Sequence, residues 1–367
     1  MRNGGWCGGM KSELRVDPIT NDVVLISPVR SERPVHLQAV SAPISRHSKP
    51  SSDSTDPFLE GNEQLTESES LAIRMEGSLP NTPGWLVRCI SNRYPAVFPW
   101  QEFWNQIPQG EELLSIVGSN SDLDRARQAP LAGIGLHDVV VECPHDETHL
   151  SRLSIDQIGL VISLWRDRLS AYMQDEHHWQ YGLIFKNHGR LAGASLPHSH
   201  SQMMALPFVP PRLLHEFNAC RVAYKTCRDS LWSQLIEQEE LLKLRVVQKT
   251  SRFLAVTPYA SRFPFELRVL PLKAQAHFSS ITDDDCEELA TLLKGLLIAL
   301  ETVAHDPDYN LVIHTAPLRE QEPSDFHWRL EILPRIGGIA GFEWGTGAFI
   351  NAVPPEIAAA QYREALS

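Results

Sequence analysis

Cysteine is scarce in this chain of 367 residues, and its spacing shows no pairs. The six cysteines are Cys7, Cys89, Cys143, Cys220, Cys227 and Cys286. A small secreted scaffold held by disulfides needs a denser and more regular set of thiols, so that class is excluded. We therefore expect free thiols and a cytoplasmic location.

Long apolar runs are also missing from the sequence. No stretch reaches the roughly 20 apolar residues that a membrane-spanning helix requires. The first ten residues carry glycines and an arginine but no apolar core of the kind found in a signal peptide. We expect residues 1–12 to form a flexible leader and the protein to have no membrane partner.

Positive charge is in deficit. Lysine and arginine total 33 against 45 aspartates and glutamates, which leaves a formal net charge of −12. Such a balance argues against a nucleic-acid backbone as the main partner. An anionic small substrate would have to meet a local cluster of donors. The length and the hydrophobic content of 43% are sufficient for two domain-sized units with a sizeable core.

The chemistry-bearing stretch that is present runs from residue 186 to residue 207. Within it His198, His200 and Gln202 are spaced two residues apart. In a strand, alternate side chains share a face, so the three should project to the same side. A glycine-bearing loop precedes them, and its backbone N–H groups could approach an anion closely. The pattern predicts a surface that handles phosphate.

The residue types at this surface suit group transfer to phosphorus. A neutral imidazole is a good nucleophile near pH 7 and can form a phosphoryl- or nucleotidyl-histidine. A hydrogen bond from its other nitrogen to a backbone carbonyl would select the reactive tautomer. Gln202 can donate to a phosphate oxygen but cannot protonate a leaving group, which favours transfer over hydrolysis. Histidines at this spacing are also potential metal ligands, and for His198 that alternative stays open.

The string from His198 to Gln202 resembles the H-P-H-x-Q motif of the galactose-1-phosphate uridylyltransferase family, a branch of the histidine-triad (HIT) superfamily. The longer stretch 192–207 is still more similar to plant-type ADP-glucose phosphorylases, and the likeness spans about residues 15–364. It implies an α+β fold of two HIT-like repeats, each an antiparallel sheet with packed helices. It also implies a homodimer acting on a nucleotide sugar and a sugar 1-phosphate or phosphate.

The sequence divides into a series of expected units. We expect an N-terminal HIT-like domain over 13–210, which opens with two short strands around Asn21 and contains a long loop over 35–70. Further strands are expected at 85–90, 135–142 and 179–185, with a helix that Ser154 and Gln157 begin as a capping box. A long helical pattern over 212–243 lies in a connector at 211–245, and a C-terminal HIT-like domain follows over 246–367.

An internal repeat links the two halves. His149 and His277 begin similar strings 128 residues apart, and Tyr181 and Tyr309 begin similar strands at the same offset. His200 aligns with His327 at an offset of 127, but Arg329 stands where Gln202 would be. The loop before His327 carries no glycine. We therefore assign the nucleophile to the first copy and expect His327 to be packed or to face substrate.

The family's zinc is poorly supported. Many relatives carry C-P-x-C where this chain has Asp56-Pro57-Phe58-Leu59, so both thiolates are absent. His137 and His198 match the other two zinc positions of the family. Two histidines with a distant Asp56 make a weak structural zinc site. No firm cofactor is implied, although these two histidines remain the ligands if a metal is retained.

The resemblance also implies a set of substrate contacts. Arginines at two positions would reach the nucleotide and its phosphates, a turn after residue 91 would contact base and ribose, and a late glycine-rich loop would hold the hexose. The expected substrate-binding residues are Arg30, Arg33, Asn92, Arg93, Asn187, Gly193, Ser195, Gly341, Glu343 and His327.

The resulting functional hypothesis is nucleotidyl transfer by two displacements. His200 attacks the α-phosphorus of a nucleotide sugar, Gln202 and Ser195 steady the phosphoryl oxygens, and His198 supports the loop and orients His200. The leading expectation is UDP-glucose:hexose-1-phosphate uridylyltransferase of galactose metabolism. The alternative is ADP-glucose phosphorylase, which adenylylates phosphate. A HIT-type hydrolase, which would need a third histidine at position 202, and a non-catalytic nucleotide-sugar binder rank below both.

Overall fold

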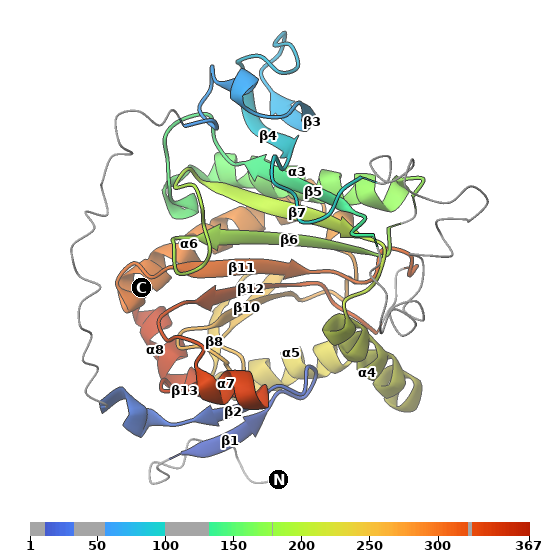
Figure 1. Ribbon diagram of the computed structural model, residues 1–367. Coiled ribbons are helices and arrows are strands. Elements are labelled where there is room, and N and C mark those ends of the chain that lie inside the picture. The colour runs from blue at the N-terminus through green and yellow to red at the C-terminus, as the bar shows by residue number, and fades with distance from the viewer. Residues whose placement is uncertain (1–11, 33–55, 100–131, 178, 322–324) are drawn as a thin grey trace.

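The computed structural model describes residues 12–32, 56–99, 132–177, 179–321 and 325–367 (Figure 1). Three expected features lie outside these ranges. They are residues 1–11 of the expected leader, residues 35–55 of the expected long loop, and Arg33. The strands are β1 (Glu13–Val16), β2 (Val23–Ile26), β3 (Glu69–Arg74), β4 (Trp85–Ser91), β5 (Leu136–Val141), β6 (Tyr181–His188), β7 (His200–Leu206), β8 (Val246–Lys249), β9 (Phe253–Val256), β10 (Leu267–Pro271), β11 (Tyr309–His314), β12 (Arg329–Pro334) and β13 (Phe349–Asn351). The α-helices are α3 (Ile155–Gln174), α4 (Pro211–Cys227), α5 (Leu231–Leu242), α6 (Asp283–Ala304), α7 (Gly341–Thr346) and α8 (Pro355–Ala365), and the short 3₁₀ turns are η1 (Pro28–Glu32), η2 (Glu63–Leu65), η5 (Leu150–Arg152) and η6 (Phe278–Ser280).

Two sheets organise the described residues. A ten-stranded sheet has the order β3-β4-β5-β7-β6-β11-β12-β10-β9-β8, and each neighbouring pair in it is antiparallel. A three-stranded sheet, β1-β2-β13, lies apart from it at the bottom of Figure 1. Helices pack against the large sheet, so the expected α+β class is confirmed.

The two repeats meet at the pair β6–β11. Ile184 pairs with Ile313, and Phe185 pairs with Val312. Since 313 − 185 = 128 and 312 − 184 = 128, each residue lies opposite the repeat equivalent of its neighbour. The register thus has the local two-fold symmetry that the sequence offset requires. One sheet is continuous through both repeats.

The helices that follow each repeat's opening string begin in the same way. Ser154 caps α3 by accepting from the Gln157 backbone N–H, and Thr282 caps α6 by accepting from that of Asp285. Thr282 and Asp285 form a full capping box. The capping box expected at Ser154 forms only on one side, because the Gln157 side chain instead donates to the carbonyls of Leu86 and Glu142.

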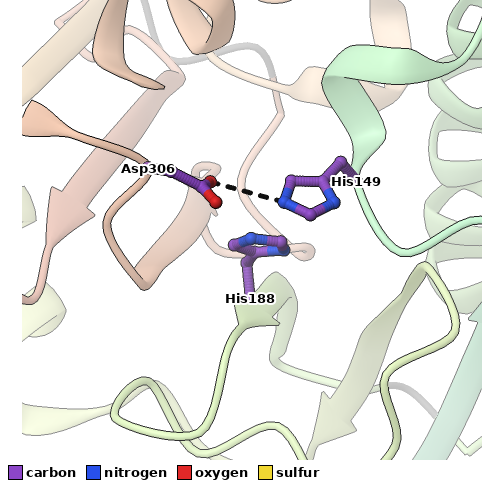
Figure 2. A group of neighbouring side chains, drawn as sticks. All are labelled: His149, His188 and Asp306. Atoms are coloured by element: carbon purple, nitrogen blue, oxygen red, sulfur yellow. Dashed lines mark ion pairs between the residues drawn. The ribbon is translucent and has the colours of Figure 1, made fainter. Parts of the chain in front are cut away.

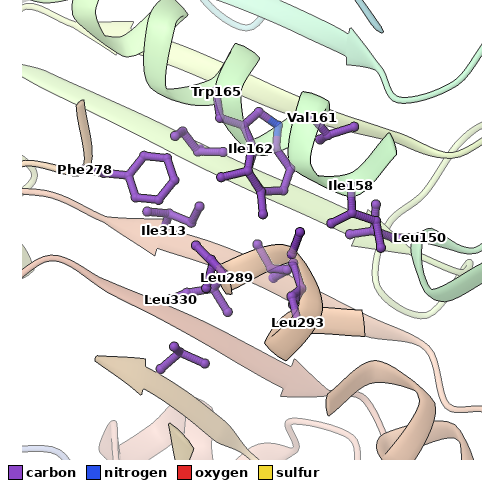
Figure 3. Close-up of a cluster of buried hydrophobic side chains, with 14 of the residues drawn as sticks. Leu150, Ile158, Val161, Ile162, Trp165, Phe278, Leu289, Leu293, Ile313 and Leu330 are labelled. Carbon is purple, nitrogen blue, oxygen red and sulfur yellow. The ribbon is translucent and has the colours of Figure 1, made fainter. Parts of the chain in front are cut away.

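The main core lies between α3, α6 and one face of the large sheet. Figure 3 shows Ile162 and Trp165 of α3 and Leu289 of α6 meeting Ile313 and other sheet residues. Burying side chains of this size contributes about 1.5–3 kcal/mol each relative to exposure. The helix-covered face is therefore the rigid side of the sheet, and polar side chains that share it are closely packed.

The helical pattern over 212–243 is not one helix. α4 ends at Cys227, where Arg228 takes a left-handed conformation with φ of 58°, and Ser230 caps α5 by accepting from the Trp232 backbone N–H. The apolar spacing alone did not reveal this break. The domain boundaries at residues 210 and 245 stay a prediction.

None of the helices in the described ranges combines the length and apolar character that a membrane span would need.

Candidate active site

Strand β7 carries His200 and Gln202 on one face. Trp165 of α3 donates from Nε1 to Ser201 Oγ at 2.8 Å, which places Ser201 on the helix-covered face. By alternation His200 and Gln202 lie on the opposite face. The ring of Phe58 contacts the rings of both His198 and His200, with centroids 5.9 and 5.4 Å away. The expectation that His200 and Gln202 project to the same side of the strand is confirmed, and His198, which lies before the strand begins, contacts the same Phe58 ring as His200.

His200 presents one ring nitrogen for reaction. Its Nδ1 lies 2.7 Å from the backbone oxygen of His198. A carbonyl oxygen can only accept, so Nδ1 carries the hydrogen and Nε2 keeps its lone pair. Burial lowers the pKa of His200, and the charge of Lys186 lowers it further. The ring is therefore neutral near pH 7 and nucleophilic, with 6% of its surface exposed.

A buried lysine bonds to the backbone of His200. Lys186 Nζ donates to Glu142 Oε2 at 2.6 Å, to Ser199 Oγ at 3.0 Å and to the backbone oxygen of His200 at 3.0 Å. The cluster fixes the backbone where β7 begins. The sequence pattern did not predict this cluster. The available signal was a lysine that strand alternation places on the same face as the buried Ile184 of β6.

His198 is held between two acceptors. Its Nδ1 lies 2.7 Å from Asp56 Oδ2, and its Nε2 lies 2.9 Å from the backbone oxygen of Cys143. Burial alone would lower the pKa of His198, but its hydrogen bonds to Asp56 and Cys143 raise it to about 10. The hydrogen bond with His198 likewise keeps the pKa of Asp56 below its usual value despite burial. His198 is thus an imidazolium paired with a carboxylate.

The zinc that the family resemblance implies does not fit these residues. Both nitrogens of His198 donate hydrogen bonds, so neither offers a lone pair to a metal. His137 pairs with Met204 on β5–β7, whereas His198 contacts Cys143, six residues further along the chain from His137. Six strand residues span about 20 Å. His137 and His198 cannot ligate one ion, and Asp56 instead neutralises His198 directly.

His137 orients Gln202. The backbone N–H of Ala96 donates to His137 Nδ1 at 3.1 Å, so the ring hydrogen is on Nε2. That Nε2 lies 2.8 Å from Gln202 Oε1 and donates to it. The carbonyl end of the Gln202 amide is therefore engaged. Its NH₂ end is left to donate to a phosphate oxygen.

The turn at Asn92 and Arg93 is brought to the same place. Asn92 Nδ2 lies 3.2 Å from His137 Nε2, and Asn92 Oδ1 accepts from the backbone N–H of Tyr94 at 2.9 Å. Arg93 is exposed next to it. Asn92 is thus connected to Gln202 through His137, and Arg93 is its exposed neighbour in the chain.

Of the predicted substrate contacts, Asn187 lies near the end of β6, and Gly193 and Ser195 lie in the loop between β6 and β7. Gly193 has φ of 93°, and a Cβ added to it would lie 3.7 Å from Asn187 Nδ2. Ser195 is exposed. The amides of Gly193 and Ala194 are already bonded within the loop. Fewer N–H groups are available for an anion than the glycine content suggested.

Two residues of the second repeat hold this loop. Asp308 Oδ2 accepts from the Leu191 backbone N–H at 2.6 Å. Asn310 Nδ2 donates to Asn187 Oδ1 at 2.9 Å and to the backbone oxygen of Ala192 at 2.8 Å. Neither residue was predicted, because the pairing of β6 with β11 that brings them here is a tertiary contact.

A second group of predicted residues lies away from His200. Arg30 is exposed on η1, beside the small sheet, and Gly341 and Glu343 lie on α7, next to β13 of that sheet (Figure 1). Glu343 Oε2 accepts from the Ala340 backbone N–H at 2.9 Å and so caps its own helix. Within one chain these residues do not meet β7.

His327 is fully buried. Its Nε2 lies 3.3 Å from Ser233 Oγ of α5. Burial lowers the pKa of His327 to about 4. The packed role fits this burial, and the assignment of His327 as a substrate-binding residue stays a prediction.

Two domain descriptions of one family match the sequence. The N-terminal domain of galactose-1-phosphate uridyl transferase matches residues 129–210, and the C-terminal domain matches residues 216–334.

Individual proteins extend the likeness over the whole chain. An ADP-glucose phosphorylase of Arabidopsis thaliana is 35% identical over 96% of this chain and 92% of its own. A galactose-1-phosphate uridylyltransferase of Thermotoga maritima is 28% identical over 96% of this chain and 98% of its own. The crystal structure of the Arabidopsis phosphorylase with bound ADP-glucose superimposes with a TM-score of 0.75 at 32% identity, covering 96% of this chain and 99% of that one. A uridylyltransferase structure gives 0.69 at 28% identity, covering 96% and 98%.

Proposed function

The chain belongs to the galactose-1-phosphate uridylyltransferase family, and from that premise we propose that it is an ADP-glucose phosphorylase working through an adenylyl-histidine. Members of this family are nucleotidyltransferases, and the sequence and structural matches support the same class of activity here. The observation that carries the mechanism is the hydrogen bond from His200 Nδ1 to the His198 carbonyl, which leaves Nε2 as a neutral nucleophile.

The first displacement forms a P–N bond. His200 Nε2 attacks the α-phosphorus of ADP-glucose, and the bond from that phosphorus to the bridging oxygen breaks. Glucose 1-phosphate leaves with the bonding electron pair on its phosphate oxygen. Because a phosphate is a weakly basic leaving group, no general acid is needed at position 202. Gln202, which cannot protonate a leaving group, is therefore compatible with this step.

The second displacement reverses the first. An oxygen of inorganic phosphate attacks the same phosphorus, the P–N bond breaks, and ADP leaves while His200 regains its lone pair. His137 orients the Gln202 amide. The NH₂ group of that amide donates to a non-bridging oxygen in both steps. Ser195 can add a hydroxyl donor from the loop.

His198 acts through position and charge. Its carbonyl selects the His200 tautomer, and its own cationic ring is fixed by Asp56 and Cys143. The cation adds positive potential beside a centre where an anionic nucleotide must bind, in a chain whose net charge is −12. Asp56 thereby performs, without metal, the anchoring of His198 that the family's zinc would provide.

The choice of donor reverses our sequence-based order. From the sequence alone, uridylyl transfer ranked first and ADP-glucose phosphorolysis second. The Arabidopsis ADP-glucose phosphorylase shares 35% of residues with this chain, against 28% for the Thermotoga uridylyltransferase over a similar length. The structural matches have the same order. We therefore place adenylyl transfer first and keep uridylyl transfer between UDP-glucose and a hexose 1-phosphate as the second candidate.

A homodimer and a cytoplasmic location complete the proposal. Arg30, Gly341 and Glu343 cluster around the small sheet, away from β7 in the same chain. In a dimer with its sites near the subunit boundary, as the resemblance implies, these residues of one subunit would contact the substrate held by His200 of the other. Size-exclusion chromatography with light scattering measures the assembly state, and a monomer with full activity would refute this arrangement.

The donor and the nucleophile are tested together in one labelling experiment. The enzyme is mixed separately with ADP-glucose and UDP-glucose, each labelled in the α-phosphate, without acceptor. We expect ADP-glucose to release about one equivalent of glucose 1-phosphate per site and to leave the label on His200. His200→Ala should abolish label and burst, while His215→Ala, which changes an exposed histidine of α4, should retain both. Labelling by UDP-glucose alone would replace the first candidate by the second, and hydrolysis without a burst would refute transfer.

A further inference from the structure

Three side chains with metal-binding chemistry converge at a place that the proposed reaction does not use. His149 precedes η5, His188 ends β6, and Asp306 follows α6 (Figure 2). Each offers one ligand atom, and these atoms all lie within 4.8 Å of one another. His149 and His188 come from the first repeat and Asp306 comes from the second. The cluster therefore bridges the repeats.

The spacing suits a tetrahedral ion. His149 Nε2 and Asp306 Oδ1 are 3.3 Å apart, and the rings of His149 and His188 have centroids 4.6 Å apart at an angle of 59°. Ligand atoms bonded to one tetrahedral zinc at about 2.0–2.1 Å lie about 3.3–3.4 Å from each other. The His149–Asp306 spacing already has this value. The third ligand atom, on His188, lies within 4.8 Å of the other two.

Neighbouring groups hold both imidazoles as ligands are usually held. Thr148 Oγ1 lies 2.6 Å from His149 Nδ1, and the Thr148 backbone hydrogen-bonds the His188 ring. A hydrogen bond to one ring nitrogen fixes the orientation of an imidazole and leaves its other nitrogen for a metal. Tyr309 stacks on His188 from the other side, with centroids 4.8 Å apart.

The cluster is separate from both the nucleophile and the position of the family's zinc. His188 alternates with Lys186 on the helix-covered face of β6, whereas His200 projects from the opposite face of the sheet. None of the three residues contacts Asp56 or His198. Because His188 immediately precedes the loop from 189 to 199, an ion here would fix the start of the loop that leads to His200.

We propose that His149, His188 and Asp306 bind one divalent first-row transition-metal ion, which ties the two repeats together behind the β6–β7 loop. Two imidazoles and one carboxylate select a borderline metal such as Zn²⁺ over Mg²⁺ or Ca²⁺, which take oxygen ligands. Three protein ligands leave a position for water. The competing possibility is a plain ion pair between a protonated His149 and Asp306, with His188 a bystander.

Metal titration of the full chain separates these possibilities. Chelator-treated, untagged protein is titrated with Zn²⁺ alone by calorimetry, with Mg²⁺ as a parallel series. We expect one Zn²⁺ per chain and a higher midpoint of thermal unfolding with Zn²⁺ but not with Mg²⁺. His188→Ala and Asp306→Asn should each weaken the affinity at least ~100-fold, since removing a ligand exceeds the usual effect of removing a ligand's hydrogen-bond partner.

A neighbouring histidine provides the matched control. His305 is exposed and has φ of 58°. Asparagine tolerates this left-handed conformation, so His305→Asn should not strain the backbone. This variant should bind Zn²⁺ like the parent. Co²⁺ substitution adds an independent readout, because a thiolate ligand produces a charge-transfer band that nitrogen and oxygen ligands do not. Absence of a one-to-one site, unchanged affinity in Asp306→Asn, or a thiolate band would each overturn the proposal.

Discussion

At the scale of single residues, Asp56 and His198 form a charge pair at positions where the family resemblance implies zinc ligands. The pKa of His198 is raised to about 10 and that of Asp56 is lowered, so the pair is ionised across the neutral range. A raised histidine pKa contributes stability that is complete below about pH 6.5 and is lost as the pH rises through about 10. A lowered carboxyl pKa contributes above about pH 3.9.

Asp56→Asn removes the carboxylate and keeps the side-chain volume. Burial then dominates, so we expect the pKa of His198 to fall toward or below its usual value and His198 to be neutral near pH 7. The stability deficit relative to the parent should be largest near pH 6 and should shrink toward pH 10. Urea unfolding at several pH values measures the deficit, and NMR titration follows the ring of His198.

The same substitution should lower nucleotidyl transfer by roughly 10–100-fold, the usual effect of removing a group that orients a reactive one. Asp146→Asn, which changes an exposed carboxylate of the nearby 142–149 segment, is the matched control and should leave both the pH profile and the rate unchanged. Parent-like titration of His198 in Asp56→Asn would contradict the charge-pair account.

The contact between His137 and Gln202 decides which end of the amide faces substrate. In His137→Ala the amide loses its partner and can turn its oxygen toward the phosphate, where it repels. We expect kcat to fall at least ~10-fold, while KM changes little. The loss of one transition-state donor typically lowers kcat by about 100–1000-fold, so this is a lower bound. His137→Gln can still donate an N–H to Gln202 and should recover part of kcat. Equal losses in both variants would show that His137 is only structural.

At the scale of elements, the sequence predicted local structure well and tertiary partners poorly. The strands at β4, β5 and β7 and the helix begun by Ser154 follow from period and capping, which are local. The pseudo-symmetric register of β6 and β11 follows from the repeat offset. The break at Arg228 was not predicted, because the apolar spacing on either side of it continues.

The site was predicted to a similar depth. His200 and Gln202 lie on one face because strand alternation dictates it. The partners that tune them, Lys186 and His137, come from other strands, and strand order cannot be read from one strand's residues. His327 was placed by analogy with His200, but the second repeat packs that position against α5 instead.

The β6–β7 loop depends on Gly189. This residue has φ of 81°, and a Cβ added to it would lie 2.1 Å from Asp308 Oδ1. The same Asp308 carboxylate accepts from the Leu191 backbone N–H, so it cannot move without releasing the loop. A side chain here is opposed by both the backbone conformation and the contact.

Gly189→Ala should therefore reduce the free energy of unfolding by more than the ~1–2 kcal/mol that the left-handed conformation alone costs a residue with a Cβ. It should also displace the loop, so that kcat falls. Gly338→Ala is the control, because nothing lies within 4 Å of its added Cβ and its φ is not in the left-handed region. Chemical denaturation and steady-state kinetics on the pair provide the comparison, and equal stability of the two variants would contradict the argument.

At the scale of the whole molecule, a buried charge network joins segments far apart in the chain. Arg329 of β12 donates to both oxygens of Glu216 on α4 at 2.7 and 2.9 Å, and to Glu331 at 2.9 Å. Arg262 and Arg268 also pair with Glu331, and Arg268 pairs with Asp17 near the N-terminal hairpin. In the repeat, Arg329 holds the position of Gln202. At the position that Gln202 holds in the first copy, the second copy thus has a buried charge that connects α4 to the sheet.

Arg329→Met tests how far this network holds the molecule together. Removing the guanidinium leaves Glu216 and Glu331 buried without their main partner, and breaking a buried pair costs about 3–5 kcal/mol. Arg329→Met with Glu216→Leu should recover part of that loss, since the unpaired carboxylate on α4 is gone. Arg252→Met removes an arginine whose side chain is 38% exposed and which pairs with Asp284 and Asp285, so it should cost only about 0–1 kcal/mol. Urea unfolding of the three variants ranks them. Equal losses in Arg329→Met and Arg252→Met would mean that the connection contributes no more than a surface ion pair and that the two repeats are held by β6–β11 and the apolar core alone.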